Sequence, residues 1–329
     1  MIELMRHAFR YGDIEWHYFS YGLDIKRFRH SKDFLDDSEF IWKSYVHNTV
    51  LADIDKTCIL RDKELFGSVV GQLGFKTPRN SVVISSPDDI SDFLNALELQ
   101  QGKKYVLKPA DGQCGRGIML IRCNSHDNYA VNDEPCSRIE AIQLLDSTIG
   151  SAKYLAQEAV DQHDDISRIY CESVNTVRLI TIYNADTGEV DPLSAVLRVG
   201  ANGNKVDNWA KGGLAIALDM NTGILSGLGF YKYGNGTKTP THPDTGIPFS
   251  GIKIPYWKEI VNQALSLHRH ILPLFIIGWD IAVTKDGPVF IEGNDNMEIS
   301  INQEVHGGYK QIVDSYFARN LERKLKTKK

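Results

Sequence analysis

Apolar positions recur with a helical period in the first quarter of the chain. Between residues 62 and 78 they form one helix face: Leu65, Phe66, Val69, Val70 and Leu73. Asp62 is placed to cap this helix, Gly74 to end it, and Pro78 lies beyond. Residues 1–80 are therefore predicted to form a mainly helical N-terminal region.

After residue 80 short β-branched and apolar runs alternate with two amphipathic segments. The strand-like runs are SVVIS, KYVLKP, GIMLIRC and YLAQEAV, and the helix-like segments are SPDDISDFLNALELQ and SRIEAIQLLDSTIG. Their order favours hairpin-like pairs over a regular βαβ series. Residues 81–160 are predicted to form one α+β lobe.

The rest of the chain, residues 161–329, is predicted to form a second and larger lobe. Strands are expected at 173–184, 190–199 and 213–219, a helix at about 256–271, then a hairpin and a final helix. Residues 221–255 show no clear period and are predicted to be irregular. An irregular stretch of this length is typical of a functional loop.

The hairpin GWDIAVTKDGPVFIEGND, residues 278–295, contains three groups that fit badly in a core. If Thr284 faces Pro288 across the turn, Asp280 lies opposite Glu292, and Asn294 shares the face of Glu292. Opposed carboxylates repel unless a positive charge lies between them, and oxygen ligands of this kind suit Mg²⁺. The alternative is a hairpin whose acids lie on a solvated face.

Composition narrows the classes of partner. The chain has 329 residues, is 42% hydrophobic and 24% charged, and has a net charge of -5 with a pI near 6.1. This balance gives no electrostatic footprint for nucleic acid. No stretch reaches the ~18 apolar residues of a membrane span, and the first residues lack a signal-peptide core. We therefore expect a cytoplasmic protein.

Cysteine usage points to free thiols. The five cysteines form no CxxC pair, which favours neither a disulfide framework nor a zinc site. The histidines form no metal-binding pattern either.

A glycine-rich segment, YVLKPADGQCGRGIMLI, follows a strand that ends at Lys108. Its glycines at positions Gly112, Gly115 and Gly117 leave backbone N–H groups able to approach an anion. Lys108 is placed as a compact positive charge against a phosphate. The alternative is an ordinary hairpin.

Two arginines lie inside predicted strands. A buried guanidinium must be paired, so Arg178 in SVNTVRLITIYN and Arg198 in AVLRVG either bridge to structural acids or await an anionic ligand. Lys211, in VDNWAKGGLAIAL, is either part of a flexible polar loop or an anion contact.

The strand YLAQEAV turns polar before DQHDD. Its edge can offer backbone groups to a purine ring, and Asp165 or His163 could take ribose hydroxyls. The alternative is an amphipathic edge strand.

The order of these features resembles the ATP-grasp superfamily. A lysine at a helix start (Lys63), a strand lysine with a glycine flap, a Gln-Glu hinge, a strand arginine and an acidic hairpin follow one another over residues 55–308. Within this range NTVRLIT, DNWAKGGL and FIEGNDNM are similar to the sugar-transfer-associated branch, which is related to alpha-L-glutamate ligases.

The resemblance implies an ATP-grasp fold in which two α+β lobes clasp ATP, with roles for named residues. Lys63, Lys108 and the glycine flap would contact phosphates. Asp165 would take ribose, and adenine would lie against Gln157, Glu158, Ala159 and Val160. Asp280, Glu292 and Asn294 would bind one or two Mg²⁺ ions, and Arg178, Arg198 and Lys211 would serve the chemical step.

The implied function is an ATP- and Mg²⁺-dependent carboxylate-amine ligase that forms an acyl phosphate, acting on small molecules in cell-surface polysaccharide or peptide biosynthesis. Phosphoryl transfer depends mainly on positive charges held in position, and this sequence contains candidate lysines, arginines and metal ligands. It shows no evident catalytic nucleophile. A kinase acting on a small-molecule hydroxyl is the first alternative, and a nucleotide-binding partner without turnover is the second. The sequence leaves open whether the chain forms a homo-oligomer.

One position departs from the superfamily pattern. Many members carry an arginine two residues ahead of the first metal acid, and here that residue is Gly278. The resemblance therefore leaves the anion-stabilising role to Arg178 or Arg198.

Overall fold

The computed structural model describes residues 21, 31–79, 82–110, 117–232, 238–271 and 273–327, which form two compact units. The smaller unit comprises Cys58–Asp161 with Val289–Ile291. The larger unit comprises Met1–Thr57, Gln162–Pro288 and Glu292–Lys329. Two sheets with helices on their faces confirm the predicted α+β class.

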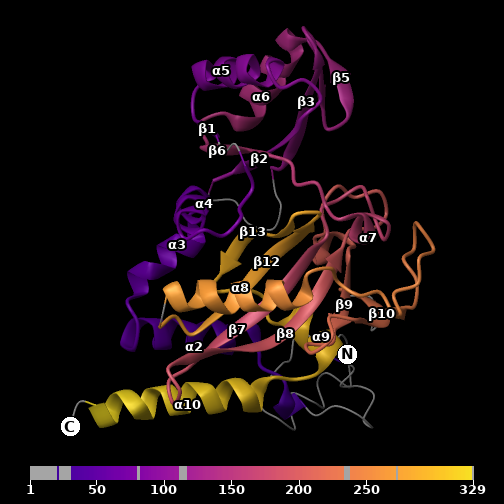
Figure 1. The fold of residues 1–329 in the computed structure, drawn as a ribbon. Helices are drawn as coiled ribbons and strands as arrows, with labels where there is room; N and C mark the ends of the chain where they lie inside the picture. Colours follow the sequence, from indigo (N-terminus) through magenta and orange to yellow (C-terminus); the bar gives the residue numbers. More distant parts are fainter. Residues whose placement is uncertain are drawn as a thin grey trace, which may run out of the picture. The chain divides into compact units, whose positions relative to one another are not determined.

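The smaller unit is built on a six-stranded antiparallel sheet of order β1-β6-β2-β3-β4-β5, with α5 and α6 packed over one face (Figure 1). Its strands are β1 Val82–Ile84, β2 Lys104–Pro109, β3 Met119–Ser125, β4 Asn128–Val131, β5 Glu134–Cys136 and β6 Tyr154–Glu158. Its helices are α3 Cys58–Arg61, α4 Lys63–Gln72, α5 Pro87–Glu98 and α6 Arg138–Ile149.

Local sequence determines where these helices begin. Asp62 accepts hydrogen bonds from two backbone N–H groups in the first turn of α4, which confirms the predicted cap. Ser86 caps α5, and Ser137 forms a capping box with Glu140 at the start of α6. Each cap satisfies N–H groups that a first helical turn leaves unpaired.

The larger unit is built on a seven-stranded sheet of order β11-β10-β9-β8-β7-β12-β13. Its strands are β7 Thr176–Asn184, β8 Glu189–Val199, β9 Leu214–Leu218, β10 Leu225–Tyr231, β11 Lys238–Thr239, β12 Ile276–Thr284 and β13 Gly287–Asn294. Its helices are η1 Ser31–Asp33, α2 Asp37–Val50, η2 Ile54–Thr57, α7 Asp164–Ser167, η3 Trp209–Lys211, α8 Trp257–His270, α9 Ser300–His306 and α10 Lys310–Thr327.

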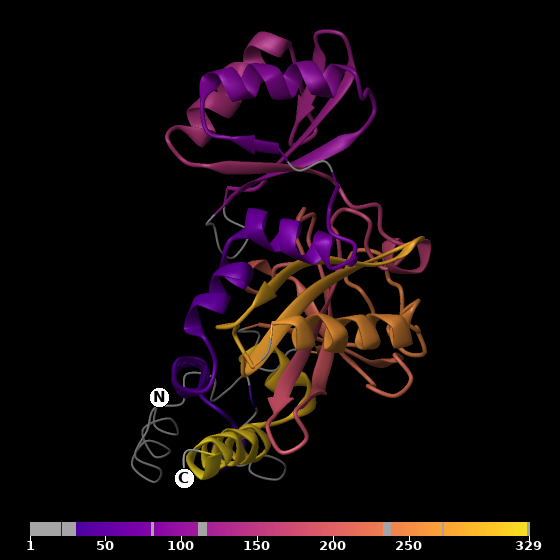
Figure 2. The same cartoon turned by 60° about the vertical axis from the view of Figure 1, so that its left-hand side comes forward.

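Alternate residues of β7 face different helices. Ile180 and Ile182 join an apolar cluster with Phe40 of α2 and Val313 of α10. Thr181 points to the opposite face, which α8 covers (Figure 2). The period of two along a strand thus gives this sheet a helical layer on each side.

Two strands lie inside the stretch that the sequence predicts to be irregular. β10 and β11 both fall within residues 221–255, so that prediction is wrong there. Gly229 of β10 explains the misreading, because a Cβ at this position would lie 2.8 Å from the ring of the buried Phe249. β10 has a glycine where it packs against this ring. It therefore lacks an apolar side chain at a position where one would have helped to predict a strand.

None of the helices in the described ranges is long and apolar enough to cross a membrane.

A buried relay of hydrogen bonds ties β12 and β7 to α8. Trp279 Nε1 donates to Thr181 Oγ1 at 2.8 Å, and the Thr181 hydroxyl lies 2.8 Å from His268 Nδ1. His268 Nε2 lies 2.9 Å from the Leu274 carbonyl. All of these groups are satisfied when the imidazole is neutral and carries its proton on Nε2. Burial correspondingly lowers the pKa of His268 to about 4.

The relay predicts acid sensitivity. Between pH 6.5 and about 4 the unfolded chain binds a proton at residue 268 that the folded chain does not, so stability falls as the pH drops through this window. At pH 5 the cost is about 2 kcal/mol. We expect His268→Gln to reduce the difference in unfolding free energy between pH 7 and pH 5 by about this amount, measured by urea denaturation.

The matched control is His270→Gln, two residues along the same helix at an exposed position. It removes a second imidazole from the same helix and so controls for the substitution itself. An equal pH dependence in the two variants would contradict the relay.

Candidate functional site

Strand register brings four polar side chains to one face of the larger sheet. Asp280 of β12 lies directly opposite Arg178 of β7, and Thr176 of β7 lies opposite Arg198 of β8. Cross-strand partners share a face, as do residues two apart along a strand. The apolar part of this face, around Ile180, therefore gives way to a charged part toward Arg178.

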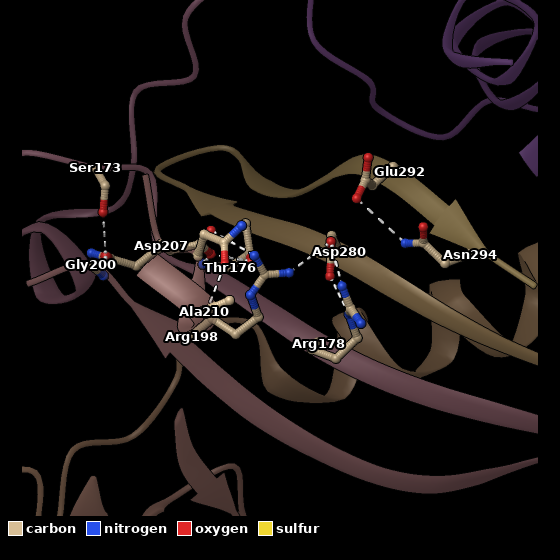
Figure 3. A network of polar contacts seen from close by, with 12 residues as sticks. Ser173, Thr176, Arg178, Arg198, Gly200, Asp207, Ala210, Asp280, Glu292 and Asn294 are labelled. Atoms are coloured by element: carbon tan, nitrogen blue, oxygen red, sulfur yellow. Dashed lines mark hydrogen bonds and ion pairs between the residues drawn. The ribbon is translucent and has the colours of Figure 1, made fainter. Parts of the chain in front are cut away.

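Asp280 lies between two guanidinium groups (Figure 3). Arg178 donates through Nε to Oδ1 and through Nη2 to Oδ2, the latter at 2.9 Å. Arg198 Nη1 donates to the same Oδ2 at 2.9 Å. The side chain of Asp280 is only 6% exposed. Burial acts to raise the pKa of Asp280, but the two arginines outweigh it and hold this pKa well below its usual range.

These ion pairs show how both buried arginines are neutralised. Each guanidinium bridges to an acid, and contact with an anionic ligand stays a prediction. The positive charge expected beside Asp280 is supplied by the chain itself. Glu292 belongs to the same electrostatic cluster, because it interacts with both Asp280 and Arg198.

Asp207 is a member of the cluster that the sequence did not identify. Its carboxylate accepts from the backbone N–H of Thr176 at 3.0 Å, from the Thr176 hydroxyl at 2.5 Å, and from Arg198 Nη2 at 2.9 Å. Burial raises the pKa of Asp207, and Arg198 opposes this effect. Its partners lie on β7 and β8, so no spacing within VDNWAKGGL marks it.

Glu292 and Asn294 lie two residues apart on β13 and are both partly exposed. Asn294 Nδ2 lies 3.5 Å from Glu292 Oε1 (Figure 3). It also lies 3.4 Å from the Gly278 carbonyl. One carboxylate and one amide oxygen are donors that suit a hard divalent cation. In the ranges that the structure describes, no three His, Cys, Asp or Glu residues gather into a metal-binding group.

Gly278 has no space for a side chain. A Cβ at this position would lie 2.1 Å from Met297 Sδ and 3.4 Å from Cδ of Arg178. Met297 is buried in the same apolar cluster as Ile180. The place of the superfamily arginine is thus filled by a thioether, and the guanidinium nearest to it comes from the neighbouring strand.

Two further candidates of the larger unit lie in exposed segments. Lys211 ends η3, whose first turn Asn208 caps through a hydrogen bond to Ala210 N. Asp165 lies in α7, and its backbone N–H donates to His163 Nδ1 at 3.2 Å. Their roles in anion and ribose binding stay predictions.

In the smaller unit, two lysines lie near the start of the glycine-rich segment. Lys108 is the fifth residue of β2 and pairs with Leu155 of β6, and Lys63 begins α4 with its Nζ 3.5 Å from the Pro109 carbonyl. Their assignment to phosphates stays a prediction.

Of the three flap glycines, Gly117 lies among the described residues. Its φ is +71°, and a Cβ there would lie 2.7 Å from the Tyr154 hydroxyl, so only glycine fits. Gly112 and Gly115 lie outside the described residues.

The proposed adenine edge follows the end of β6. The backbone N–H of Glu158 donates to the Arg79 carbonyl and that of Ala159 to the Lys104 carbonyl. The Glu158 carboxylate pairs with Lys103 at 3.1 Å. Gln157 is buried, whereas Val160 is partly exposed. The N–H groups of Glu158 and Ala159 are therefore used within the unit, and contact with adenine stays a prediction.

Comparison with known proteins identifies the class. The chain is an ATP-grasp protein: the family model described as "Sugar-transfer associated ATP-grasp" matches residues 48–310. The chain belongs to this family, which confirms the resemblance in its sequence. No curated protein matches it.

Solved structures of a ligase and a synthetase are similar to the chain. D-alanine–D-alanine ligase from Bacillus anthracis complexed with ATP is 11% identical, with a TM-score of 0.45 over 83% of this chain and 69% of the ligase. D-cycloserine synthetase DcsG is 14% identical, with a TM-score of 0.46 over 86% of this chain and 79% of the synthetase.

The ATP-grasp ligase PsnB, complexed with its precursor peptide and AMPPNP, is 13% identical, with a TM-score of 0.43 over 81% of this chain and 60% of PsnB. For an N5-carboxyaminoimidazole ribonucleotide synthetase complexed with ADP, the chain spans 46% of that protein's length.

The Asp207 cluster predicts a large loss of stability on neutralisation. Asp207→Asn removes one acid from a buried pair and leaves Arg198 with a single carboxylate partner. We expect the free energy of unfolding to fall by about 2–4 kcal/mol, measured by urea denaturation. The control is Asp161→Asn, which removes the same charge from an exposed position and should change stability by less than about 0.5 kcal/mol. Equal effects of the two substitutions would contradict a structural role for Asp207.

Proposed function

We propose that the chain is an ATP- and Mg²⁺-dependent ligase that activates a small-molecule carboxylate as an acyl phosphate and joins it to an amine. Membership of an ATP-grasp family supports the use of ATP. The observation that carries the proposal is the pair of guanidinium groups, Arg178 and Arg198, held on one sheet face beside Glu292.

Both chemical steps of such a ligase depend mainly on positive charges held in position. A carboxylate oxygen of the first substrate attacks the γ-phosphorus of ATP, and ADP leaves with the bridging oxygen. The amine nitrogen of the second substrate then attacks the acyl carbon, inorganic phosphate leaves, and the amine loses a proton. Negative charge concentrates on phosphoryl and carbonyl oxygens in both steps, where guanidinium N–H donors stabilise it.

Arg178 and Arg198 are assigned to these oxygens. Each guanidinium carries five N–H groups and gives two hydrogen bonds to acids, so donors remain for an anionic ligand. Lys211 is assigned a supporting contact to the same anion. No covalent intermediate with the protein is required.

Glu292 and Asn294 are the residues of the larger unit that fit a magnesium ion, because their oxygen donors are partly exposed. When bound, Mg²⁺ supplies neutralisation of charge on the β- and γ-phosphates. In the smaller unit, Lys63, Lys108 and the glycines are assigned to phosphates, and Gln157 to Val160 to adenine.

The family description suggests a place for the reaction in sugar transfer, which fits an acid or amine substrate in cell-surface polysaccharide or peptide biosynthesis. A cytoplasmic location accords with a supply of ATP.

Hydroxylamine distinguishes this proposal from phosphorylation of a hydroxyl. With ATP, Mg²⁺ and pools of amino acids and sugar acids, we expect a hydroxamate to form in amounts matching the ADP released, because hydroxylamine attacks an acyl phosphate and releases phosphate. Mass spectrometry of each active pool identifies the acid. A phosphate ester with no hydroxamate would replace the ligase by a kinase, and the absence of ADP release in every pool would remove both.

Lys108→Ala tests the phosphate assignment in the smaller unit. We expect at least a roughly tenfold loss of ATP affinity by calorimetry, because a compact positive charge opposite phosphate oxygens is removed. Lys104→Ala is the matched control, since Lys104 lies on the same strand four residues earlier and is exposed. Similar ATP affinities for both variants would contradict the assignment.

A further inference from the structure

We infer that Asp280 is a positioning residue for Arg178 and Arg198, and that the metal ion is bound by Glu292 and Asn294 without it. This inference rests on the proposed function and changes the expected role of the first acid of the hairpin. It follows from how the Asp280 carboxylate is used, where it lies and what it neutralises.

The carboxylate of Asp280 is occupied by hydrogen bonds. Two oxygens offer about four lone-pair sites, and three are taken by N–H groups of two guanidiniums. Only one site, on Oδ1, is not directed at a guanidinium, so Asp280 is poorly placed to serve the near-octahedral shell that a magnesium ion requires.

Burial separates Asp280 from the other two groups. Its side chain is 6% exposed, whereas Glu292 and Asn294 are partly exposed. Mg²⁺ usually keeps several waters and takes one or two carboxylates together with substrate phosphates. Glu292 and Asn294 can meet that requirement at the solvent side of the cluster, and Asp280 cannot.

Replacing these ion pairs by a metal ion would also cost free energy. Within the described ranges, Arg178 has no acid partner at ion-pair distance other than Asp280. Both residues are fixed in paired strands, opposite each other in the register of β12 and β7. Moving the carboxylate to a cation would leave the buried Arg178 without a counter-charge and bring a divalent ion against two guanidiniums.

The arrangement has a use in the proposed reaction. Asp280 sets the directions of both guanidiniums, and Asp207 fixes the far side of Arg198. The remaining N–H donors are thereby held in place before an anion arrives, which avoids reorganisation during the reaction. Asp280 acts through the arginines, in the way that outer residues orient the ligands of a metal.

Metal binding separates this role from ligation. The probe is Mn²⁺ titrated into protein with AMP-PNP and followed by electron paramagnetic resonance. We expect Asp280→Asn to bind Mn²⁺ within about twofold of the parent protein, and Glu292→Gln to bind it at least about tenfold more weakly. Asp286→Asn, which removes an exposed acid from the turn of the same hairpin, is the control for net charge. Equal weakening in Asp280→Asn and Glu292→Gln would overturn the inference.

Nucleotide affinity reports on the arginines. In the parent protein AMP-PNP should bind more tightly than ADP, because the arginines contact the terminal phosphate. Asp280→Asn should lose this preference while its ADP affinity stays unchanged. A loss of affinity for both nucleotides alike, or for neither, would contradict a positioning role.

If Asp280→Asn does not fold, crystals of the parent protein still test the inference. Crystals soaked with Mn²⁺ and ADP should show an anomalous peak at about 2.1 Å from oxygens of Glu292 and Asn294, with Asp280 still bonded to Arg178. A peak bonded to Asp280 would overturn the inference and leave the ligase proposal standing. Failure of the parent protein to bind nucleotide and metal in solution or in the crystal would remove the proposed function and the inference with it.

Discussion

The neutralisation of Asp280 by two arginines is the constraint on which the polar end of the larger sheet depends. A carboxylate this deeply buried is stable only where its charge is matched, and here the match comes from strands on one side of it, β7 and β8. Because Arg198 also binds Asp207, and Asp207 binds the start of β7 through Thr176, the charges form one chain of hydrogen bonds. The polar residues therefore hold one another in place through these hydrogen bonds.

The same sheet shows how a fold can place such a cluster without strain. Along one face of β7, Ile182 and Ile180 pack against helices, and Arg178 and Thr176 follow at the same period. Toward the opposite face, Thr181 anchors the relay to His268 and α8. The apolar part of each face supplies the stability that a cluster of buried charges does not provide by itself.

Much of this architecture could be predicted from the sequence, because periodicity and caps are local signals. The cap at Asp62 and the α+β class followed from them, and the order of motifs indicated the family. Strand β10 was missed because Gly229 serves a neighbour, Phe249, that is distant in sequence. Asp207 was missed for the same reason, since its partners lie on β7 and β8 and no spacing within its own loop reveals them. Residues whose partners lie far away in the sequence are therefore the hardest to identify from a linear pattern.

The contact between Gly278 and Met297 has a consequence for how this protein can change. An arginine introduced at 278 would collide with a buried sulfur and with the stem of Arg178, so it requires a smaller residue at 297 in the same step. The two positions are therefore expected to be strongly epistatic. Packing around Met297 thus keeps position 278 without a side chain, and the guanidinium stem nearest to it is that of Arg178 on β7.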